Sequence, residues 1–304
     1  MKKIQGIIPP MITPLLNDDV IDVEGAKNLV ENMIGAGVHA IFILGTTGEA
    51  QSLSYKCRHD FVELVCGAVA GRVPVLVGIT DTSLAESVRL ADKAKECGAA
   101  GVVAAAPYYF APSQQELIEY YTELADKVSL PLYIYNMPSN VKVFLEAKTI
   151  AALAKHPNIV GLKDSSHNMT YLNSVKYLLR DMPDFALYVG PEELTGEAVL
   201  MGADGGVNGG ANMFPELYVA MYNAAVARDI EEVRRLQTKI MAISTTIYSV
   251  GKYGSSYLKG VKCAASLLGY CNDHLAWPYR KFEAEERAKV AEALRALGAE
   301  VKNA

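Results

Sequence analysis

The chain has 304 residues, of which 51% are hydrophobic and 21% are charged, and its formal net charge is -5. This composition is typical of a chain that buries a substantial core, and it argues against global disorder. The mild negative charge provides no basic surface for nucleic acid, and no apolar run approaches the ~20 residues that a membrane span requires. The five cysteines, an odd number with neither disulfide nor CxxC spacing, predict a reducing, cytoplasmic location.

In chain order, continuous apolar runs alternate with segments whose apolar residues recur at helical spacing. Eight runs predict strands, at residues 6–13, 39–45, 73–80, 99–107, 130–136, 158–163, 185–190 and 204–210. The segments between them predict helices, at residues 22–36 and 54–70, from 83 and from 113 onward, and at 146–155, 169–180 and 192–201. Ser83 and Ser113, each followed three residues later by glutamate, predict capping boxes at two of these helices.

Eight strands that alternate with helices over about 225 residues predict a (β/α)8 TIM barrel. The runs are continuously apolar, as expected of parallel strands that are buried on both faces. A doubly wound open sheet is the alternative, but no G-x-G-x-x-G motif follows the first strand. The C-terminal part is helical, with helices near 214–228, 230–250, 255–268 and 283–297. We therefore expect a barrel at residues 1–225 and a helical extension at 226–304 that packs on it.

One predicted strand contains a lysine, Lys163, among the apolar residues Ile159, Val160 and Leu162. Because side chains alternate along a strand, Gly161 and Lys163 share one face. A lysine is rarely buried without a reason, and burial lowers the pKa of the amine and favours a nucleophile that forms a Schiff base with a ketone. The alternative is a lysine at a strand end, whose stem packs while its head group reaches solvent.

The active site of such a barrel lies at the carboxyl ends of its strands. Polar side chains gather at these positions in the sequence: Thr46-Thr47-Gly48, Tyr108-Tyr109, Tyr135-Asn136, Lys163, Glu192-Glu193 and Asn208-Gly209-Gly210. Each has a purely structural explanation when taken singly, such as a tight turn. Together they suit carbonyl chemistry, in which a lysine is the nucleophile and a tyrosine with a neighbouring hydroxyl moves protons. Threonine hydroxyls and turn N–H groups would hold a carboxylate.

With these motifs the chain resembles the dihydrodipicolinate synthase / N-acetylneuraminate lyase family of class I, pyruvate-dependent aldolases. The motifs are Gly45-Thr46-Thr47-Gly48-Glu49, Pro107-Tyr108-Tyr109, Tyr135-Asn136-Met137-Pro138-Ser139, Gly161-Leu162-Lys163-Asp164 and Gly202-Ala203-Asp204-Gly205-Gly206. The resemblance covers nearly the whole chain. It implies a Schiff base on Lys163, proton transfer by Tyr135, and a carboxylate site at Thr46 and Thr47, with Thr47 also in the proton relay. Tyr109 matches a tyrosine that some members donate to the neighbouring subunit, which implies a homo-oligomer, either a dimer or a tetramer.

The same resemblance implies a lyase whose small-molecule partners are pyruvate and an aldehyde. It implies no cofactor, because the substrate is bound covalently as a Schiff base on Lys163. The predicted substrate-binding positions are Thr46, Thr47, Asn140, Gly190, Glu192 and Val207. The five histidines show no metal-ligand spacing, so a metal-dependent aldolase is not supported.

Two positions bear on the substrate. Dihydrodipicolinate synthases usually carry an arginine where this chain has Asn140, and asparagine cannot form the bidentate charged pair with a substrate carboxylate. Glu192 stands where lyases of polyhydroxylated sugar acids place acidic residues, although the position equally suits the first turn of a helix. We therefore expect a 2-keto-3-deoxy sugar acid or a related hydroxylated keto acid as substrate. The alternatives are a 4-hydroxy-tetrahydrodipicolinate synthase, which condenses pyruvate with aspartate semialdehyde, and a non-catalytic keto-acid sensor.

Overall fold

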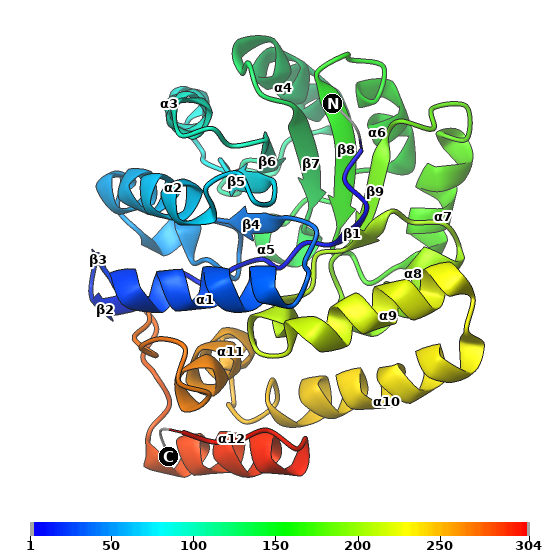
Figure 1. The fold of residues 1–304 in the computed structure, drawn as a ribbon. Helices are drawn as coiled ribbons and strands as arrows, with labels where there is room; N and C mark the ends of the chain where they lie inside the picture. Colours follow the sequence, from blue (N-terminus) through cyan, green and yellow to red (C-terminus); the bar gives the residue numbers. More distant parts are fainter. Residues whose placement is uncertain (1–2, 303–304) are drawn as a thin grey trace.

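The computed structural model describes residues 3–302, and its centre is a curled sheet of eight parallel strands (Figure 1). The strands are β1 (Gly6–Ile7), β4 (Ile41–Ile43), β5 (Val75–Gly78), β6 (Gly101–Ala105), β7 (Leu132–Asn136), β8 (Ile159–Asp164), β9 (Ala186–Val189) and β10 (Gly205–Gly206). Their spatial order is β1-β10-β9-β8-β7-β6-β5-β4. Strands β4 to β7 and β9 are buried along their whole length, which explains their continuously apolar sequences. The predicted TIM barrel is confirmed.

The barrel closes where the segment after β1 meets β4. The Phe42 N–H donates to the Pro9 carbonyl (2.9 Å), and the Met11 N–H donates to the Phe42 carbonyl (2.8 Å). Because Pro9 has no N–H to donate, regular strand pairing stops early and β1 is shorter than predicted. On its other side, β1 lies so close to β10 that a Cβ on Gly205 would be 1.8 Å from the Gly6 carbonyl oxygen, so only glycine fits at that position.

Helices surround the sheet (Figure 1). They are α1 (Val23–Gly35), α2 (Tyr55–Val69), α3 (Leu84–Glu96), α4 (Gln114–Lys127), α6 (Ala147–Leu153), α7 (Met169–Leu178), α8 (Thr195–Leu200) and α9 (Pro215–Ala227). The capping box at Ser113 is confirmed, because its side chain accepts from the Glu116 N–H and the Glu116 carboxylate accepts in return. The capping box predicted at Ser83 is wrong: its side chain caps nothing, and its N–H already donates to Asp81 (2.9 Å) rather than to Glu86.

Two small elements were not predicted from the sequence. An antiparallel hairpin, β2 (Leu15–Asn17) and β3 (Val20–Ile21), turns at Asp19, whose φ of 60° is left-handed. A short helix, α5 (Pro138–Val141), follows β7 directly. Both are too short to show a hydrophobic period. Helix α5 matters for the site because it carries Asn140 close to the carboxyl end of β7.

Three further helices follow α9 and occupy the lower part of the view in Figure 1: α10 (Ile230–Thr246), α11 (Ser256–Leu267) and α12 (Ala284–Ala296). Their buried residues, among them Ile243, Val261 and Val290, belong to the same hydrophobic cluster as the barrel strands. Burial of each such side chain contributes roughly 1.5–3 kcal/mol, so the helices are held firmly on the barrel. The division of the chain at residue 225 stays a prediction. Within residues 3–302, no helix combines the length and the hydropathy that crossing a membrane requires.

Candidate active site

A cavity of about 730 Å³ opens at the carboxyl ends of the barrel strands. It is lined by eight of the nine residues predicted for catalysis or substrate binding: Thr46, Thr47, Tyr135, Asn140, Lys163, Gly190, Glu192 and Val207. The ninth, Tyr109, lies outside the cavity and is 77% exposed. The structure therefore brings the predicted residues together, while the role of each one stays a prediction.

Lys163 extends from β8 into the end of the barrel and is only 6% exposed, so its head group is not in bulk solvent. Its Nζ lies 4.0 Å from the centroid of the Tyr135 ring and 5.0 Å from that of Phe42. Burial lowers the pKa of the Lys163 amine, against an opposing influence of Tyr135. The space above Gly161 is filled by a core side chain, because a Cβ there would lie 2.7 Å from the Tyr133 ring. The lowered pKa makes the neutral, nucleophilic form of the amine easier to reach than in an exposed lysine.

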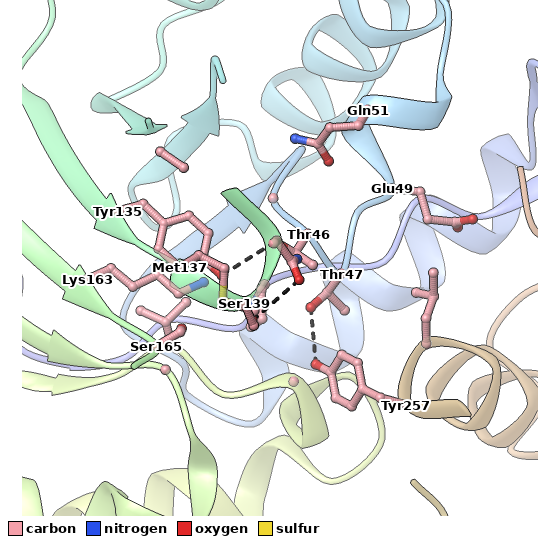
Figure 2. A pocket seen from close by; sticks show the side chains of 18 of the residues that line it. Thr46, Thr47, Glu49, Gln51, Tyr135, Met137, Ser139, Lys163, Ser165 and Tyr257 are labelled. Carbon is pink, nitrogen blue, oxygen red and sulfur yellow. Dashed lines mark hydrogen bonds between the residues drawn. The ribbon is translucent and has the colours of Figure 1, made fainter. Parts of the chain in front are cut away.

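Tyr135 is the register partner of Lys163 on the neighbouring strand β7, and Figure 2 shows the two side chains next to each other. Its hydroxyl lies 3.4 Å from Thr46 Oγ1. Burial alone would raise the pKa of Tyr135, but the charge of Lys163 and hydrogen bonds with Thr46 and Ser165 bring it below its ordinary value. A phenol in this position is suited to exchange protons with atoms bonded to the Lys163 amine.

The two threonines of the loop after β4 have different partners. The Thr46 hydroxyl contacts Tyr135, whereas Thr47 Oγ1 lies 3.1 Å from the Tyr257 hydroxyl at the start of α11 (Figure 2). The hydroxyl beside Tyr135 is thus that of Thr46, and the part of Thr47 in a proton relay stays a prediction. Adjacent residues of a turn point in different directions, and Thr47 points away from β7 toward the helical extension.

The conformation of this loop is strained and held from outside. Leu44 and Glu49, which bracket it, both have a left-handed φ of 56°. Such a conformation costs about 1–3 kcal/mol in a residue other than glycine and persists only where the surroundings enforce it. The Thr13 hydroxyl supplies part of this support by donating to the Gly48 carbonyl (2.7 Å).

The remaining support comes from the helical extension. Glu49 forms a buried ion pair with Lys262 of α11, whose side chains are 1% and 0% exposed respectively. Glu49 also accepts a hydrogen bond from the Ala276 N–H (2.9 Å), and Lys262 donates to the His274 carbonyl (2.6 Å). Burial lowers the pKa of Lys262, and the charge of Glu49 opposes that change. The loop that carries both threonines is thus fixed to the C-terminal helices.

The ends of β7 and β8 are tied together one residue beyond Tyr135 and Lys163. The Asn136 side-chain amide donates to Asp164 Oδ1 (2.8 Å), and the Ser166 hydroxyl donates to Asp164 Oδ2 (2.8 Å). Burial raises the pKa of Asp164, and these hydrogen bonds oppose the rise. This bond between the strands holds the spacing of the amine and the phenol, a function that we did not predict for Asn136 or Asp164.

Glu192 is 3% exposed and accepts three hydrogen bonds, from the Tyr218 hydroxyl (2.5 Å), the Tyr248 hydroxyl (2.7 Å) and the Gly210 N–H (2.7 Å). Burial raises the pKa of Glu192 to about 7, although the three bonds act in the opposite direction. Most of its acceptor capacity is therefore used within the protein. Glu192 does begin a helical turn, and its role toward substrate hydroxyls stays a prediction. The adjacent Glu193 also lines the cavity, and within residues 3–302 its carboxylate has no hydrogen-bond partner.

Three tyrosines near the cavity were not singled out in the sequence: Tyr248 and Tyr257, which line it, and Tyr218, which is buried and contacts Glu192. Tyr218 lies on α9, Tyr248 in the turn after α10 and Tyr257 on α11, so the last two are far along the chain from the strand ends that they face. The one feature of the sequence that indicates these tyrosines is the pair Gly209-Gly210. A Cβ on Gly209 would lie 1.7 Å from the Tyr257 hydroxyl, and one on Gly210 would lie 1.9 Å from the Tyr218 hydroxyl. Consecutive glycines at a strand end indicate a close approach, but not which residue approaches.

Comparisons with proteins of known sequence agree with this geometry. The sequence profile described as "Dihydrodipicolinate synthetase family" matches residues 3–297. Two curated proteins named 4-hydroxy-tetrahydrodipicolinate synthase are similar over nearly their whole length. The protein from Methanospirillum hungatei is 32% identical over 292 residues, which is 95% of this chain and 98% of that protein. The protein from Geobacter metallireducens is 34% identical over 287 residues, which is 94% of this chain and 96% of that protein.

Solved structures superpose over the same extent. A dihydrodipicolinate synthase from Bacteroides thetaiotaomicron is 57% identical, with a TM-score of 0.95 over 97% of this chain and 99% of that one. A prophage protein of the dihydrodipicolinic acid synthase family from E. coli K12, solved in complex with pyruvate, is 28% identical, with a TM-score of 0.91 over 97% and 99% of the two chains. This chain therefore belongs to the dihydrodipicolinate synthetase family, whose members are lyases of the class I aldolase type.

Proposed function

We propose that this enzyme is a Schiff-base-forming, pyruvate-dependent aldolase or lyase that acts on a hydroxylated 2-keto acid, such as a 2-keto-3-deoxy sugar acid. The charge of the cavity wall carries the proposal. Among the described residues that line the cavity, Lys163 is the only lysine or arginine, whereas Glu192 and Glu193 are acidic. A third glutamate of the lining, Glu49, is neutralised by its ion pair with Lys262. The wall therefore suits a substrate whose far end is neutral and hydroxylated rather than anionic.

The chemistry follows from the position of the amine and the phenol. The Lys163 amine attacks C2 of the keto acid, and the carbinolamine loses water as Tyr135 gives a proton to the leaving hydroxyl. Tyr135, left as a phenolate, takes the proton of the C4 hydroxyl and keeps it for return to C3. The C3–C4 bond breaks and its electron pair moves to the iminium, so that an aldehyde leaves and an enamine remains. Protonation at C3 and addition of water release pyruvate and the free amine. The reverse sequence condenses pyruvate with an aldehyde.

The two ends of the substrate call for different partners. The hydroxyls of Thr46 and Thr47 and the N–H groups of their turn suit the carboxylate next to the keto group. At the other end, the half-buried Glu193 offers acceptor oxygens to sugar hydroxyls. Asn140, exposed at the edge of the cavity, offers an amide that both donates and accepts hydrogen bonds.

A second candidate, 4-hydroxy-tetrahydrodipicolinate synthase, is favoured by the names of the curated relatives. Its acceptor, aspartate semialdehyde, carries a carboxylate, and transfer of a carboxylate into a site without a cationic partner costs several kcal/mol. Lys142 follows α5 but does not line the cavity. A keto-acid sensor is less well supported, since binding alone does not require a buried nucleophile such as Lys163.

The test is a substrate panel. Pyruvate release would be followed from 2-keto-3-deoxy sugar acids, sialic acid and 4-hydroxy-2-oxoglutarate, in parallel with condensation of pyruvate and aspartate semialdehyde. We expect a 2-keto-3-deoxy sugar acid to give the highest kcat/KM, above 4-hydroxy-2-oxoglutarate, whose far end is a carboxylate. A higher kcat/KM with aspartate semialdehyde would instead establish the second candidate, and the absence of any borohydride-trapped pyruvyl adduct would favour the sensor. Product analysis on the best substrate distinguishes aldol cleavage from dehydration.

We also propose that the enzyme acts as a homo-oligomer. Tyr109 and Phe110 follow β6 and are 77% and 81% exposed, an aromatic pair of the kind enriched at subunit interfaces.

All five cysteines of the chain are free thiols, which accords with the predicted cytoplasmic location.

A further inference from the structure

The Thr47 hydroxyl has a partner, Tyr257, that the proposed chemistry does not itself require. The two oxygen atoms lie 3.1 Å apart, and both residues line the cavity. Tyr257 is the second residue of α11, so the helical extension reaches the loop after β4 at this point (Figure 2). Thr47 is only 5% exposed, which leaves its hydroxyl little contact with solvent.

The surroundings of Tyr257 are shaped to hold its hydroxyl in place. A Cβ on Gly209 would lie 1.7 Å from the Tyr257 hydroxyl, so the backbone after β10 reaches the phenol only because the residue there is glycine. The Tyr248 ring packs edge-on against the Tyr257 ring, with centroids 4.8 Å apart at an angle of 76°. Tyr248 is itself fixed by donating to Glu192 (2.7 Å). The phenol is therefore supported by two separate segments.

The direction of the bond follows from the number of protons available. A carboxylate only accepts hydrogen bonds, so a threonine that holds it must donate its single hydroxyl proton to the substrate. The oxygen of Thr47 is then free to accept from Tyr257. Burial, and the nearby charge of Glu192, raise the pKa of Tyr257, so the phenol keeps the proton that it donates.

We propose that Tyr257 is a positioning residue for substrate binding: it donates to Thr47 and fixes the threonine hydroxyl in the orientation that receives the substrate carboxylate. The inference rests on the proposed pyruvate chemistry at Lys163. It gives the two threonines of the carboxylate site different supporting partners, because Thr46 contacts Tyr135, whereas Thr47 contacts Tyr257. It also gives the helical extension a direct part in binding.

The experiment is Tyr257→Phe, which removes one oxygen atom and keeps the ring on Tyr248. We expect the KM for the keto acid to rise about tenfold, the equivalent of one hydrogen bond, while kcat stays within about threefold. In a Thr47→Val background, Tyr257→Phe should raise KM no further, because the phenol acts only through the threonine hydroxyl. Tyr253→Phe, at a residue that is 77% exposed, is the matched control and should change nothing.

An unchanged KM in Tyr257→Phe overturns the inference, and so does an equal rise with and without the Thr47 hydroxyl. If Tyr257→Phe does not fold, Gly209→Ala provides the same test, because the added Cβ displaces the phenol without altering its side chain. The same rise in KM is then expected, and a normal KM overturns the inference. A wild-type protein that pyruvate and borohydride do not label overturns the proposed function instead, so the two failures are distinguishable.

Discussion

Tyr135 and Lys163 stand opposite each other on adjacent parallel strands, with the lysine Nζ 4.0 Å from the centroid of the tyrosine ring. Both strands are buried, and the bond between Asn136 and Asp164 ties their ends together. The spacing of amine and phenol is therefore set by the sheet rather than by a loop. A sheet holds reacting groups more accurately than a loop does. Conservative changes at either residue should alter the chemistry and leave the scaffold intact.

Lys163 should carry the substrate covalently. Incubation with pyruvate and borohydride should add one reduced pyruvyl group at Lys163, because the buried amine there has a lowered pKa. Lys163→Ala should lose both labelling and turnover, whereas Lys142→Ala, outside the cavity, should retain both. Peptide mass mapping locates the adduct. An adduct on Lys142, or on the other buried lysine, Lys262, would contradict the assignment.

Tyr135 should be required for turnover but not for folding. Tyr135→Phe keeps the ring beside Lys163 and removes the proton donor, so kcat should fall roughly 10²–10⁴-fold, the usual scale for general acid–base catalysis. Tyr133→Phe, two residues earlier on the same face of β7, is the matched control and should keep kcat within about threefold. Steady-state kinetics and thermal unfolding measure both. A Tyr135→Phe enzyme with nearly normal kcat would remove this phenol from the mechanism.

Asn140 should limit the use of anionic acceptors. Asn140→Arg places a guanidinium at the edge of the cavity, where it can pair with a substrate carboxylate. We expect kcat/KM for aspartate semialdehyde to rise about tenfold, since a hydrogen bond between charged groups contributes about 1.5–3 kcal/mol. Asn140→Gln, which keeps an amide, should give no such gain. Equal kcat/KM values for all three proteins would show that position 140 does not select the acceptor.

Tyr109 should act between subunits. Its side chain lies outside the cavity of its own chain, and we expect it to act at the cavity of a neighbouring copy. Light scattering should show a dimer or tetramer, and Tyr109→Ala should weaken assembly and lower kcat together. Tyr177→Ala is a suitable control, because that tyrosine is similarly exposed (67%) on the helix α7. A fully active monomer would refute the prediction.

Glu192 should make stability depend on pH. Burial raises its pKa to about 7 from an ordinary 4.5, so between these values the folded protein binds more protons than the unfolded chain. Stability therefore falls as the pH rises through this window and, for this group, is constant outside it. The loss is on the order of 3 kcal/mol.

Urea unfolding at pH 4.5 and 7.5 measures this effect. Replacing Glu192 by glutamine should remove most of the difference between the two pH values, whereas Glu197→Gln, exposed on α8, should not. The comparison uses the difference between pH values because glutamine also disturbs the bond with the Gly210 N–H. Equal pH dependence in the wild type and in Glu192→Gln would contradict the raised pKa.

The positions of site residues within regular strands could be predicted from the sequence. Contacts between residues far apart in the sequence could not. Lys163 and Tyr135 each lie in an apolar strand, so local pattern alone places them at the barrel end. No local period connects Thr47 with Tyr257, because their contact requires α11 to fold back onto the loop after β4. Ser83 and Ser113 show the same limit, since both carry the same motif and only the competing bond to Asp81 separates their outcomes.

The buried pair of Glu49 and Lys262 has a consequence for cooperativity. Removal of one partner leaves the other charge buried and alone, at a cost of about 3–5 kcal/mol. A chain shortened before α11 would therefore not be a smaller enzyme, because it would retain a carboxylate with no counter-charge in the loop that carries Thr46 and Thr47. Hydrogen exchange in that loop should follow unfolding of the C-terminal helices. We therefore expect the loop after β4 to be as persistent as the helices that anchor it.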